Sequence, residues 1–528
     1  MQARTIVDLL EHHRREYPDR IAFIDGNQRY TYAQFADLCD RATYWLQKQG
    51  IGQGDRVAVW LVNRMEWLVL LFGLSALGAT LVTVNTRYRS HEVSHILEES
   101  EASMLILEPD FRKIDFMSIL MQVNEESLKH LKLIVFVNPA DQVTDCLLNK
   151  PVSALTLEAL PDHFSVPRND AAHALCILFT TSGTTSAPKL VMHTQRTISA
   201  HSQHVARACR LEQADVILLA ALPFCGVFGF NAVFGCFAAG QPVVLMDTFD
   251  AAQANILINE HQVTHLFGSD EMFSRMLEHT HSAIPFPSAR VFGFAAFHAG
   301  FDRFGKKAWD RKIPMYGLYG SSEVQALFSL QSPDMPLNER LQPGGIPANP
   351  QARLRIRDPQ TGQLLGTGKS GVIEIYADTN FVGYLNNQAA TDQVIDAEGY
   401  FCTGDLGYLR EDGSLVYQTR QGDAIRLAGF QVNPAEIEDV LKLQSGVDDA
   451  QVVGVEVDGQ NRCVAFVITR KGCAFDENAL RSSLGQSIAA FKLPVRIWEI
   501  DAFPTTMSSN GVKIQRRKLR EMAQDTLG

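Results

Sequence analysis

The chain has 528 residues, of which 46% are hydrophobic and 20% charged, and its net charge at pH 7 is −11. One hydrophobic core rarely grows beyond about 250–300 residues, so this length predicts more than one domain. The acidic balance argues against a nucleic-acid-binding surface, which is normally basic. Small molecules are therefore the expected partners, and no nucleic acid is expected.

The nine cysteines show no CxxC or CxxH spacing, which predicts reduced thiols rather than a disulfide framework or a zinc site. The N-terminus carries charges from its fourth residue and lacks the apolar segment of a secretory signal, so a cytoplasmic location is expected. Residues 67–84 and 216–246 are uncharged and long enough to span a bilayer. Glycines interrupt the first stretch, and prolines, Asn231 and Gln241 interrupt the second, so both are expected to be buried in the protein. Peripheral contact with a membrane that carries an apolar substrate stays open.

Helical and strand patterns alternate along the first 110 residues. An amphipathic helix is expected at 5–17, a strand at 56–62, a helix at 66–78 and a buried strand at 79–85. The alternation continues to about residue 269, with strands in DVILLAALPF, QPVVLMD and VTHLFGS. This order predicts an α/β fold with a large body of mostly parallel sheets flanked by helices.

After about Leu341 the pattern changes to short strands with turns, which predicts a small β unit. From about Asp423 a strand, a helix, two strands, another helix and a basic tail follow one another. This order predicts a smaller C-terminal α+β domain. We therefore expect domains at 1–421 and 422–528, joined near Gly422.

The segment TTSGTTSAPK, residues 180–189, follows the apolar run ALCILF and so lies at the end of a buried strand. A phosphate-binding loop needs close-approaching backbone N–H groups, hydroxyl donors and a cation. A surface turn rich in Ser and Thr is the alternative. The loop is not a Walker motif, because no glycine-lysine-hydroxyl triplet closes it. The residues that fit a phosphate site are Gly183 for backbone approach, Thr181, Ser182, Thr184 and Thr185 as donors, and Lys189 as the cation.

Three further motifs carry groups that suit a nucleotide. In YGLYGSSEVQA, residues 316–326, Glu323 could hold Mg²⁺. Asp405 follows a tight Thr403-Gly404 turn and is the residue type that binds ribose hydroxyls, and Arg420 lies further along the same motif. Lys513 follows a glycine turn near the chain end, where it could reach a phosphate. Taken singly, each residue has a plainer explanation. Glu323 could be a charge at a helix start, Asp405 a turn residue, Arg420 a surface cation, and Lys513 part of a basic helix.

Taken together and in this order, the four motifs resemble the adenylate-forming superfamily of acyl-CoA synthetases, luciferases and nonribosomal-peptide adenylation domains. The resemblance covers essentially the whole chain, including residues 29–67 and FQVNPAEIEDVL at 430–441. It implies ATP, Mg²⁺ and CoA as cofactors and a mobile C-terminal domain that carries a catalytic lysine.

The resemblance implies a role for each motif residue. Thr181 to Lys189 would enclose the β- and γ-phosphates, with Thr184 as a catalytic donor and Thr185 beside Glu323 at the metal. Lys513 would bridge the carboxylate and the α-phosphate, and the small domain would then rotate about Gly422. The remaining implied roles are Tyr319 along adenine, Gly320 and Ser321 as further ATP-binding residues, Ser322 at the α-phosphate, Asp405 on the ribose, Arg420 beside it, and Gly429 with Phe430 at the CoA channel.

Some positions depart from the family pattern. Ser186 and Leu190 stand where glycine is usual, which makes the loop stiffer, and Gly226 replaces a ring at the acyl pocket, which should widen it. The segment GFAAFHAG, residues 293–300, replaces a glycine-rich stretch beside adenine. The residues expected to line the acyl pocket are Phe224, Gly226, Phe228 and Phe294.

The resulting hypothesis is an AMP-forming acyl-CoA synthetase. An apolar or aromatic carboxylic acid is the expected substrate, because residues 216–246 contain no acidic anchor for the amine of an amino acid. The alternatives are an acyl-AMP ligase that loads a carrier protein and a binding protein on a decayed synthetase fold. The oligomeric state, a homodimer included, stays open.

Overall fold

The computed structural model describes most of the chain. The described residues are 3–527, apart from 112, 140–144, 162–163, 167–170, 181–187, 296–300, 424, 428–429, 433, 458–459, 486–487, 489–491 and 509–510, and apart from the side chains of 301–304, 426, 430, 431, 436, 460, 507–508 and 511–513.

The N-terminal part of the chain builds an eight-stranded sheet that is mostly parallel. The first helix begins at a capping box, in which the Thr5 hydroxyl accepts from the Asp8 N–H (3.0 Å) and the Asp8 carboxylate accepts from the Thr5 N–H (2.9 Å). The strands in sheet order are β10 (Leu190–Thr194), β9 (Leu175–Thr180), β4 (Thr80–Thr83), β3 (Arg56–Trp60), β5 (Met104–Leu107), β6 (Leu133–Phe136), β8 (Lys150–Ala154) and β7 (Cys146–Leu147). The helices of this part are α1 (Ile6–Glu16), α2 (Tyr32–Lys48), α3 (Met65–Leu77), α4 (Ser90–Ser100), α5 (Phe116–Leu120) and the 3₁₀ helix η1 (Glu125–Leu128).

Among the described residues the second sheet has 14 strands, and the half built from the earlier part of the chain is parallel except for the antiparallel hairpin at its edge. This half confirms the α/β alternation expected from the sequence. Its strands, in sheet order from the edge, are β2 (Gln28–Thr31), β1 (Ile21–Asp25), β12 (Val243–Leu245), β11 (Leu218–Ala220), β13 (His265–Ser269), β14 (Val291–Ala295) and β15 (Met315–Ser321). The helices along this part of the chain are α6 (Gln195–Ala208), α7 (Val227–Ala238), α8 (Ala251–Glu260), α9 (Asp270–Glu278), α10 (Phe301–Asp310) and α11 (Leu337–Arg340).

The strands after about residue 341 form the small β unit expected from the sequence, and hydrogen bonding joins this unit to the rest of the large body. They continue the 14-stranded sheet, because β16 pairs antiparallel with β15 and β17 carries the hydrogen bonding on to β22. The strands of this antiparallel half are β16 (Gln325–Leu330), β17 (Gly344–Pro347), β22 (Leu415–Arg420), β21 (Phe401–Leu409), β20 (Gly371–Tyr376), β18 (Arg353–Arg357) and β19 (Leu364–Leu365), and α12 (Gln388–Val394) connects β20 to β21.

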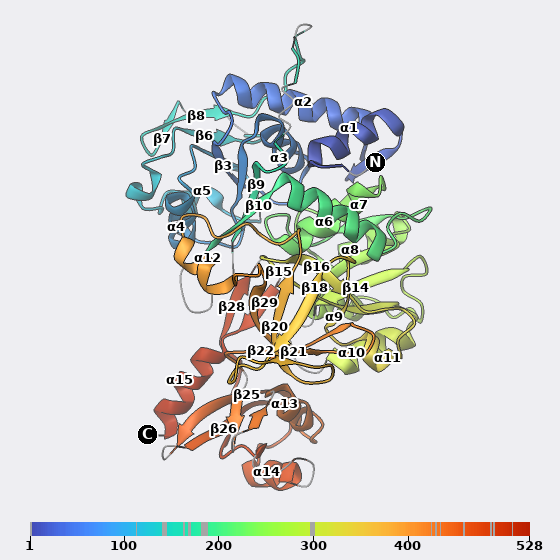
Figure 1. Ribbon diagram of the computed structural model, residues 1–528, viewed down its shortest axis with the longest axis vertical. Helices are drawn as coiled ribbons and strands as arrows, with labels where there is room; N and C mark the ends of the chain where they lie inside the picture. Colours follow the sequence, from blue (N-terminus) through green and yellow to red (C-terminus); the bar gives the residue numbers. More distant parts are fainter. Residues whose placement is uncertain are drawn as a thin grey trace.

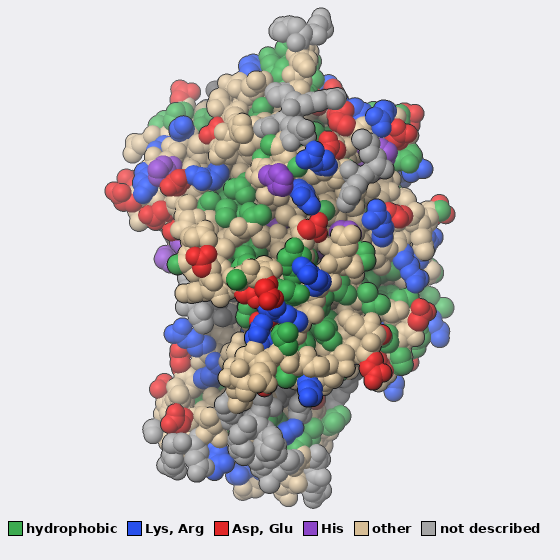
Figure 2. Space-filling view, in the orientation of Figure 1, with side chains coloured by type: hydrophobic (Ala, Val, Ile, Leu, Met, Phe, Trp, Pro, Cys, Tyr) green, Lys and Arg blue, Asp and Glu red, His purple; other side chains and the backbone are tan. Residues whose placement is uncertain are grey.

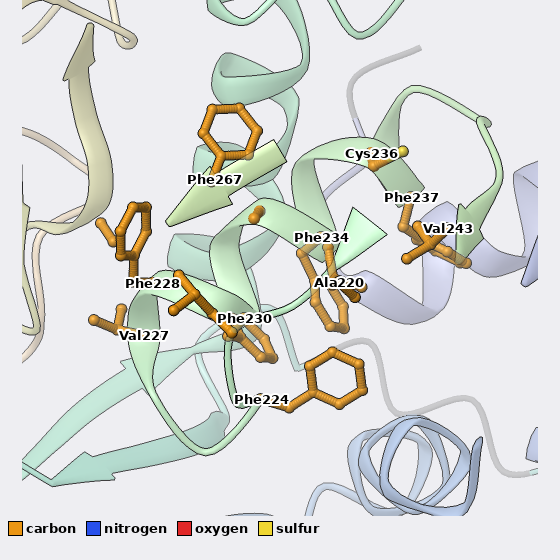
Figure 3. Packing of buried hydrophobic residues seen from close by; sticks show 14 of the residues in the cluster. Ala220, Phe224, Val227, Phe228, Phe230, Phe234, Cys236, Phe237, Val243 and Phe267 are labelled. Atoms are coloured by element: carbon orange, nitrogen blue, oxygen red, sulfur yellow. The ribbon is translucent and has the colours of Figure 1, made fainter. Parts of the chain in front are cut away.

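Helices α3 and α7 form much of the central core. Both are apolar on all sides and almost wholly buried, which is the pattern of a helix enclosed by other elements. Figure 3 shows aromatic side chains from the α7 segment packed together, and Phe230 and Phe234 stack with ring centroids 4.2 Å apart. Helix α3 ends at Gly78, which adopts the left-handed conformation, so residues 67–84 are a helix and a strand, as expected. In the described part of the chain, no helix is long and apolar enough to cross a membrane.

The C-terminal segment folds as a small α+β domain with hydrophobic clusters of its own. These clusters begin at Ile425, whereas the clusters of the large body end at Tyr417. Figure 1 shows most of this domain below the large body, while its last two strands are drawn over the large body. The boundary at 421/422 stays a prediction. The elements here are β23 (Ile425–Leu427), β24 (Phe430–Val432), α13 (Pro434–Lys442), β25 (Val447–Val457), β26 (Gln460–Thr469), α14 (Glu477–Gly485), β27 (Ile497–Glu499), β28 (Thr505–Ser508), β29 (Gly511–Ile514) and α15 (Arg516–Leu527).

Charges of both signs are interspersed over the face of the molecule shown in Figure 2. This mixture agrees with the composition, in which acidic and basic residues number 59 and 48. A nucleic-acid-binding face would instead gather basic side chains in one patch.

Acid should destabilise the large body, because several of its histidines are buried in the neutral form. Burial lowers the pKa of His13, His193 and His265 to about 4 each and that of His201 to about 3. The unfolded chain takes up these protons below its ordinary pKa of about 6.5, so stability is complete above that pH and falls toward pH 4. Between pH 7 and pH 5 we expect a loss of roughly 2 kcal/mol for each histidine with a folded pKa near 4.

Urea unfolding at pH 7 and pH 5 would measure this loss. The variant His265→Gln removes one titrating ring while keeping a donor toward the Cys209 carbonyl, which His265 contacts at 3.0 Å, so its unfolding midpoint should depend less on pH than that of the wild type. Equal midpoints for the wild type at the two pH values would contradict the expectation.

Candidate functional site

Asp405 and Arg420 face each other across two neighbouring strands. They are direct partners in the register of β21 and β22, and the Arg420 Nε lies 3.5 Å from the Asp405 Oδ1. Thr403 and Gly404 lie within β21 rather than in a turn before it, but Gly404 has a φ of +69°, and the Asp405 N–H donates to the Thr403 hydroxyl (3.0 Å). The left-handed conformation of Gly404 thus produces the expected local turn of the chain, but this turn lies within a strand.

Tyr319 connects β15 to this pair. Its hydroxyl donates to the Asp405 Oδ2 (2.7 Å), and its ring stacks on Tyr417 with centroids 5.6 Å apart. Burial and the neighbouring Asp405 carboxylate hold the pKa of Tyr319 well above its ordinary value, so the phenol remains a donor at neutral pH. The following residue, Gly320, is required sterically, because a Cβ there would lie 2.6 Å from the Gln325 carbonyl oxygen.

Glu323 lies in the turn of the β15–β16 hairpin and not at a helix start. The Ser321 hydroxyl accepts from the Glu323 and Val324 N–H groups at 3.3 and 3.4 Å, which shapes the turn. The Ser322 carbonyl accepts from the Nε2 of His193 at 2.8 Å, which fixes the hairpin to β10. The backbone therefore positions the Glu323 carboxylate from two sides.

Tyr384 joins Glu323 to Lys189 and was not found from the sequence. Its hydroxyl donates to the Glu323 Oε1 (2.9 Å), and the Lys189 Nζ lies 4.7 Å from the centre of its ring, which is cation–π geometry. Burial and the Glu323 carboxylate raise the pKa of Tyr384. The sequence signal for Tyr384 was an aromatic residue directly after a glycine. In the structure this glycine, Gly383, adopts a φ of +134°.

Electrostatic interactions extend across all these groups. Partial desolvation disfavours the charge of Arg420, whose side chain is 63% exposed, but the Asp405 carboxylate, Tyr417 and the Glu323 carboxylate together leave its pKa raised. Arg420 also lowers the pKa of Tyr384, which burial and Glu323 raise. The charge of Arg420 therefore acts both on the groups around Asp405 and on those around Glu323.

The loop expected to bind phosphate is only partly described. β9 ends at Thr180 and pairs antiparallel with β10, so the loop connects two neighbouring strands, and Lys189 lies at its far end. The strand expected before the loop is confirmed. Thr181, Ser182, Gly183, Thr184 and Thr185 lie outside the described residues, as does Ser186.

The residues predicted from the C-terminal motifs lie in the small domain or at its boundary. Gly422 is in an exposed turn, and Phe430 begins β24. The Lys513 backbone pairs with Thr506 in the β28–β29 hairpin, and Gly429 lies outside the described residues. Arg516 was not predicted from the sequence. Burial raises the pKa of Tyr417 in the large body, and the charge of Arg516 in the small domain lowers it.

The residues expected to line the acyl pocket belong to the large body. Phe224 packs edge-on against Trp67 with centroids 5.5 Å apart, and Gly226 is the N-cap of α7 with an ordinary φ of −102°. Phe228 and Phe294 are buried, and Phe294 lies in β14. Their role as pocket walls stays a prediction.

The fold and the site define a two-domain α/β protein in which charged and aromatic side chains from β15, β21, β22 and neighbouring loops lie together. The model of the AMP-binding enzyme family matches residues 10–385, and that of the AMP-binding enzyme C-terminal domain matches residues 436–510. The chain belongs to the AMP-binding enzyme family, and its expected resemblance to acyl-CoA ligases is confirmed.

Two relatives and one solved structure illustrate the likeness. A putative acyl-CoA synthetase YngI from Bacillus subtilis is 29% identical and is covered over 96% of its length by 98% of this chain. A 4-coumarate-CoA ligase 1 from Narcissus pseudonarcissus is 28% identical, with 96% of this chain covering 91% of it. The ATP-bound crystal structure of MatB from Rhodopseudomonas palustris has a TM-score of 0.82 at 23% identity, with 99% of this chain covering 100% of that one. The last likeness concerns the fold alone.

Proposed function

We propose that this protein is an ATP-dependent carboxylic acid:CoA ligase, which converts its acid to an acyl-adenylate with release of pyrophosphate and then transfers the acyl group to CoA. The observation that carries the proposal is the convergence of five side chains from separate segments of the large body: Lys189, Glu323, Tyr384, Asp405 and Arg420. The relatives named above, a putative acyl-CoA synthetase and a CoA ligase, support it.

These residues fit a nucleotide with its metal. The Asp405 carboxylate offers acceptor sites on both oxygens, so the two ribose hydroxyls can donate to it beside Tyr319. Mg²⁺ is commonly held by one or two carboxylates together with substrate phosphates, and Glu323 supplies one such carboxylate near the end of the phosphate loop. When bound, the metal would neutralise phosphate charge, and Lys189 would add a cation at the same end.

The chemistry requires activation because hydroxide is a poor leaving group from a carboxylic acid. The carboxylate oxygen attacks the α-phosphorus in line, a new P–O bond forms, and the bond to pyrophosphate breaks. Positioning and charge stabilisation dominate such phosphoryl transfers. A thiolate of CoA then attacks the activated carbonyl, the thioester bond forms, and AMP leaves with the electrons of the broken C–O bond.

We propose an apolar or aromatic acid as the substrate. Residues 216–246 contain no charged side chain, and the amide of Asn231 in α7 is already used. It donates to the Gln325 side chain (2.9 Å) and accepts from the Ala326 N–H (2.9 Å). This segment therefore offers no group that would hold the amine of an amino acid.

Pyrophosphate release would test the function directly. The protein, ATP and Mg²⁺ would be assayed with fatty, aryl and short-chain acids, with and without CoA. The proposal expects release with at least one acid and a CoA-dependent thioester product. Adenylate formation without transfer to CoA would favour a carrier protein as acceptor, and no release with any acid would favour a binding protein.

The Tyr384 hydroxyl should matter separately from its ring. Tyr384→Phe removes one hydrogen bond to Glu323, worth about 1 kcal/mol, and keeps the ring beside Lys189, so we expect KM for ATP to rise about 5-fold. Tyr384→Leu also removes the ring and should weaken ATP binding further. Pyrophosphate-exchange kinetics at varied ATP would measure both variants, and an unchanged KM in Tyr384→Leu would contradict a role for this residue at the phosphate end.

A further inference from the structure

The backbone passes from the large body to the small domain through one hydrogen-bonded turn, residues 420–423. The Asp423 N–H donates to the Arg420 carbonyl (2.9 Å), and the Gln421 N–H donates to the Gly404 carbonyl (2.8 Å) in β21. The peptide unit that precedes the Gln421 Cα is thus bonded to the large body.

The other end of the turn is bonded to the small domain by Arg520. The Arg520 Nη2 donates to the Gly422 carbonyl (2.7 Å) and to the Asp423 Oδ1 (3.0 Å). Arg520 belongs to α15, which packs on β25 of the small domain through Leu519 and Ala523. The peptide unit that follows the Gly422 Cα therefore moves with the small domain.

Between these two anchors, the freely rotating bonds are the φ and ψ torsions of Gln421 and Gly422. A cavity of about 230 Å³ lies beside the turn, lined by Gly422, Asp423 and Arg520 among others, so the turn is not packed in on that side. Because Asp423 bonds back to Arg420, a large change in these torsions would break that single turn bond and leave both anchors intact.

Nothing in the described conformation requires glycine at position 422. A Cβ there would have no atom within 4 Å, and the φ of Gly422 is outside the left-handed region. The main advantage of glycine is its access to backbone conformations closed to other residues. That advantage is unused in this conformation and would be used only in a second conformation of this turn.

We propose that Arg520 is a positioning residue that holds the Gly422–Asp423 peptide on the small domain and so confines domain rotation to the torsions of Gln421 and Gly422. The catalytic consequence rests on the proposed two-step function. Without the clamp, the torsions of Asp423 also become free, and the small domain spreads over orientations that align neither half-reaction.

The natural cysteines allow a direct measurement of domain orientation. Cys146 is exposed on the large body and Cys473 is exposed on the small domain, while Cys402 is half-buried and the other cysteines are buried. Spin labels on Cys146 and Cys473, in a Cys402→Ser background, would report the interdomain distance distribution by double electron–electron resonance.

The test compares Arg520→Ala with Arg517→Ala as a matched control. Arg517 lies on the same helix but pairs with Glu521 (2.9 Å) and is exposed. We expect Arg520→Ala to broaden the distance distribution at least about 2-fold and to lower kcat for both half-reactions about 5- to 10-fold with KM for ATP unchanged. Asp423→Asn, a change in the turn itself, should show a smaller broadening in the same direction.

The Arg517→Ala control should keep the wild-type distribution and rates. A distribution in Arg520→Ala as narrow as in Arg517→Ala would overturn the proposal, and so would a lowered thermal stability without broadening. If the wild type activates no acid, the proposed function fails, but the distance distributions still decide the hinge assignment.

Discussion

Lys513→Ala is expected to slow acyl-adenylate formation about 10²- to 10³-fold while leaving thioester formation from supplied acyl-adenylate at the wild-type rate. Negative charge builds up around the α-phosphorus in the first half-reaction, where a lysine ammonium would stabilise it, whereas thiol attack takes place at the carbonyl carbon. Pyrophosphate exchange measures the first step, and single-turnover transfer from synthetic acyl-adenylate to CoA measures the second.

The position of Lys513 suits such a role. Its backbone lies in the short β28–β29 hairpin, and the hairpin leads into Arg516, whose Nη2 donates to both carboxylate oxygens of the buried Glu438 (2.8 and 3.0 Å). The charge of Arg516 is felt at Tyr417, which stacks on Tyr319. The base of the hairpin is thus held on the small domain within electrostatic reach of the proposed nucleotide site.

A lysine elsewhere on the same segment provides the control for this prediction. Lys518 is exposed on α15, and Lys518→Ala removes the same charge from the domain, so it should leave both half-reactions unchanged. Gly429→Leu should show the reverse of Lys513→Ala, with adenylation kept and CoA transfer slowed. Equal losses in both half-reactions of Lys513→Ala would contradict the assignment of this lysine to the first step.

Local patterns were enough to predict the elements of the large body. The amphipathic spacing at 5–17 corresponds to α1, and the apolar helix expected at 66–78 corresponds to α3, which ends at Gly78. The extension of the 14-stranded sheet by β16 to β22 could not be predicted. That extension depends on pairings such as Gly344 with Val416, which join residues far apart in the sequence.

The candidate site also contains some residues that local sequence patterns predict and others that depend on contacts far apart in the sequence. Asp405 and Arg420 stand in motifs that the sequence reveals, and their register pairing explains why both face one place. Tyr384 and His193 were missed, since each acts through a partner more than 60 residues away, Glu323 and Ser322 respectively. The roles of Thr181 to Thr185 and of the Lys513 side chain stay predictions.

Asp405→Asn is expected to lower kcat/KM for ATP about 10²-fold, because hydrogen bonds to a charged acceptor are worth about 1.5–3 kcal/mol each and the amide offers only one acceptor oxygen. The structure adds a second cost. The Tyr319 hydroxyl donates to the Asp405 Oδ2 (2.7 Å). An amide nitrogen in place of this oxygen has no lone pair to accept the Tyr319 O–H, so the hydrogen bond would be lost.

Tyr319→Phe in combination with Asp405→Asn separates these two effects. If Tyr319 acts through Asp405, the double variant should lose less ATP affinity than the sum of the two single losses. KM for the acid should not change in any of the three variants, because Asp405 interacts with Tyr319 and Arg420, where we place the nucleotide. Additive losses would show that Tyr319 does not act through Asp405, and a raised KM for the acid alone would remove Asp405 from the nucleotide site.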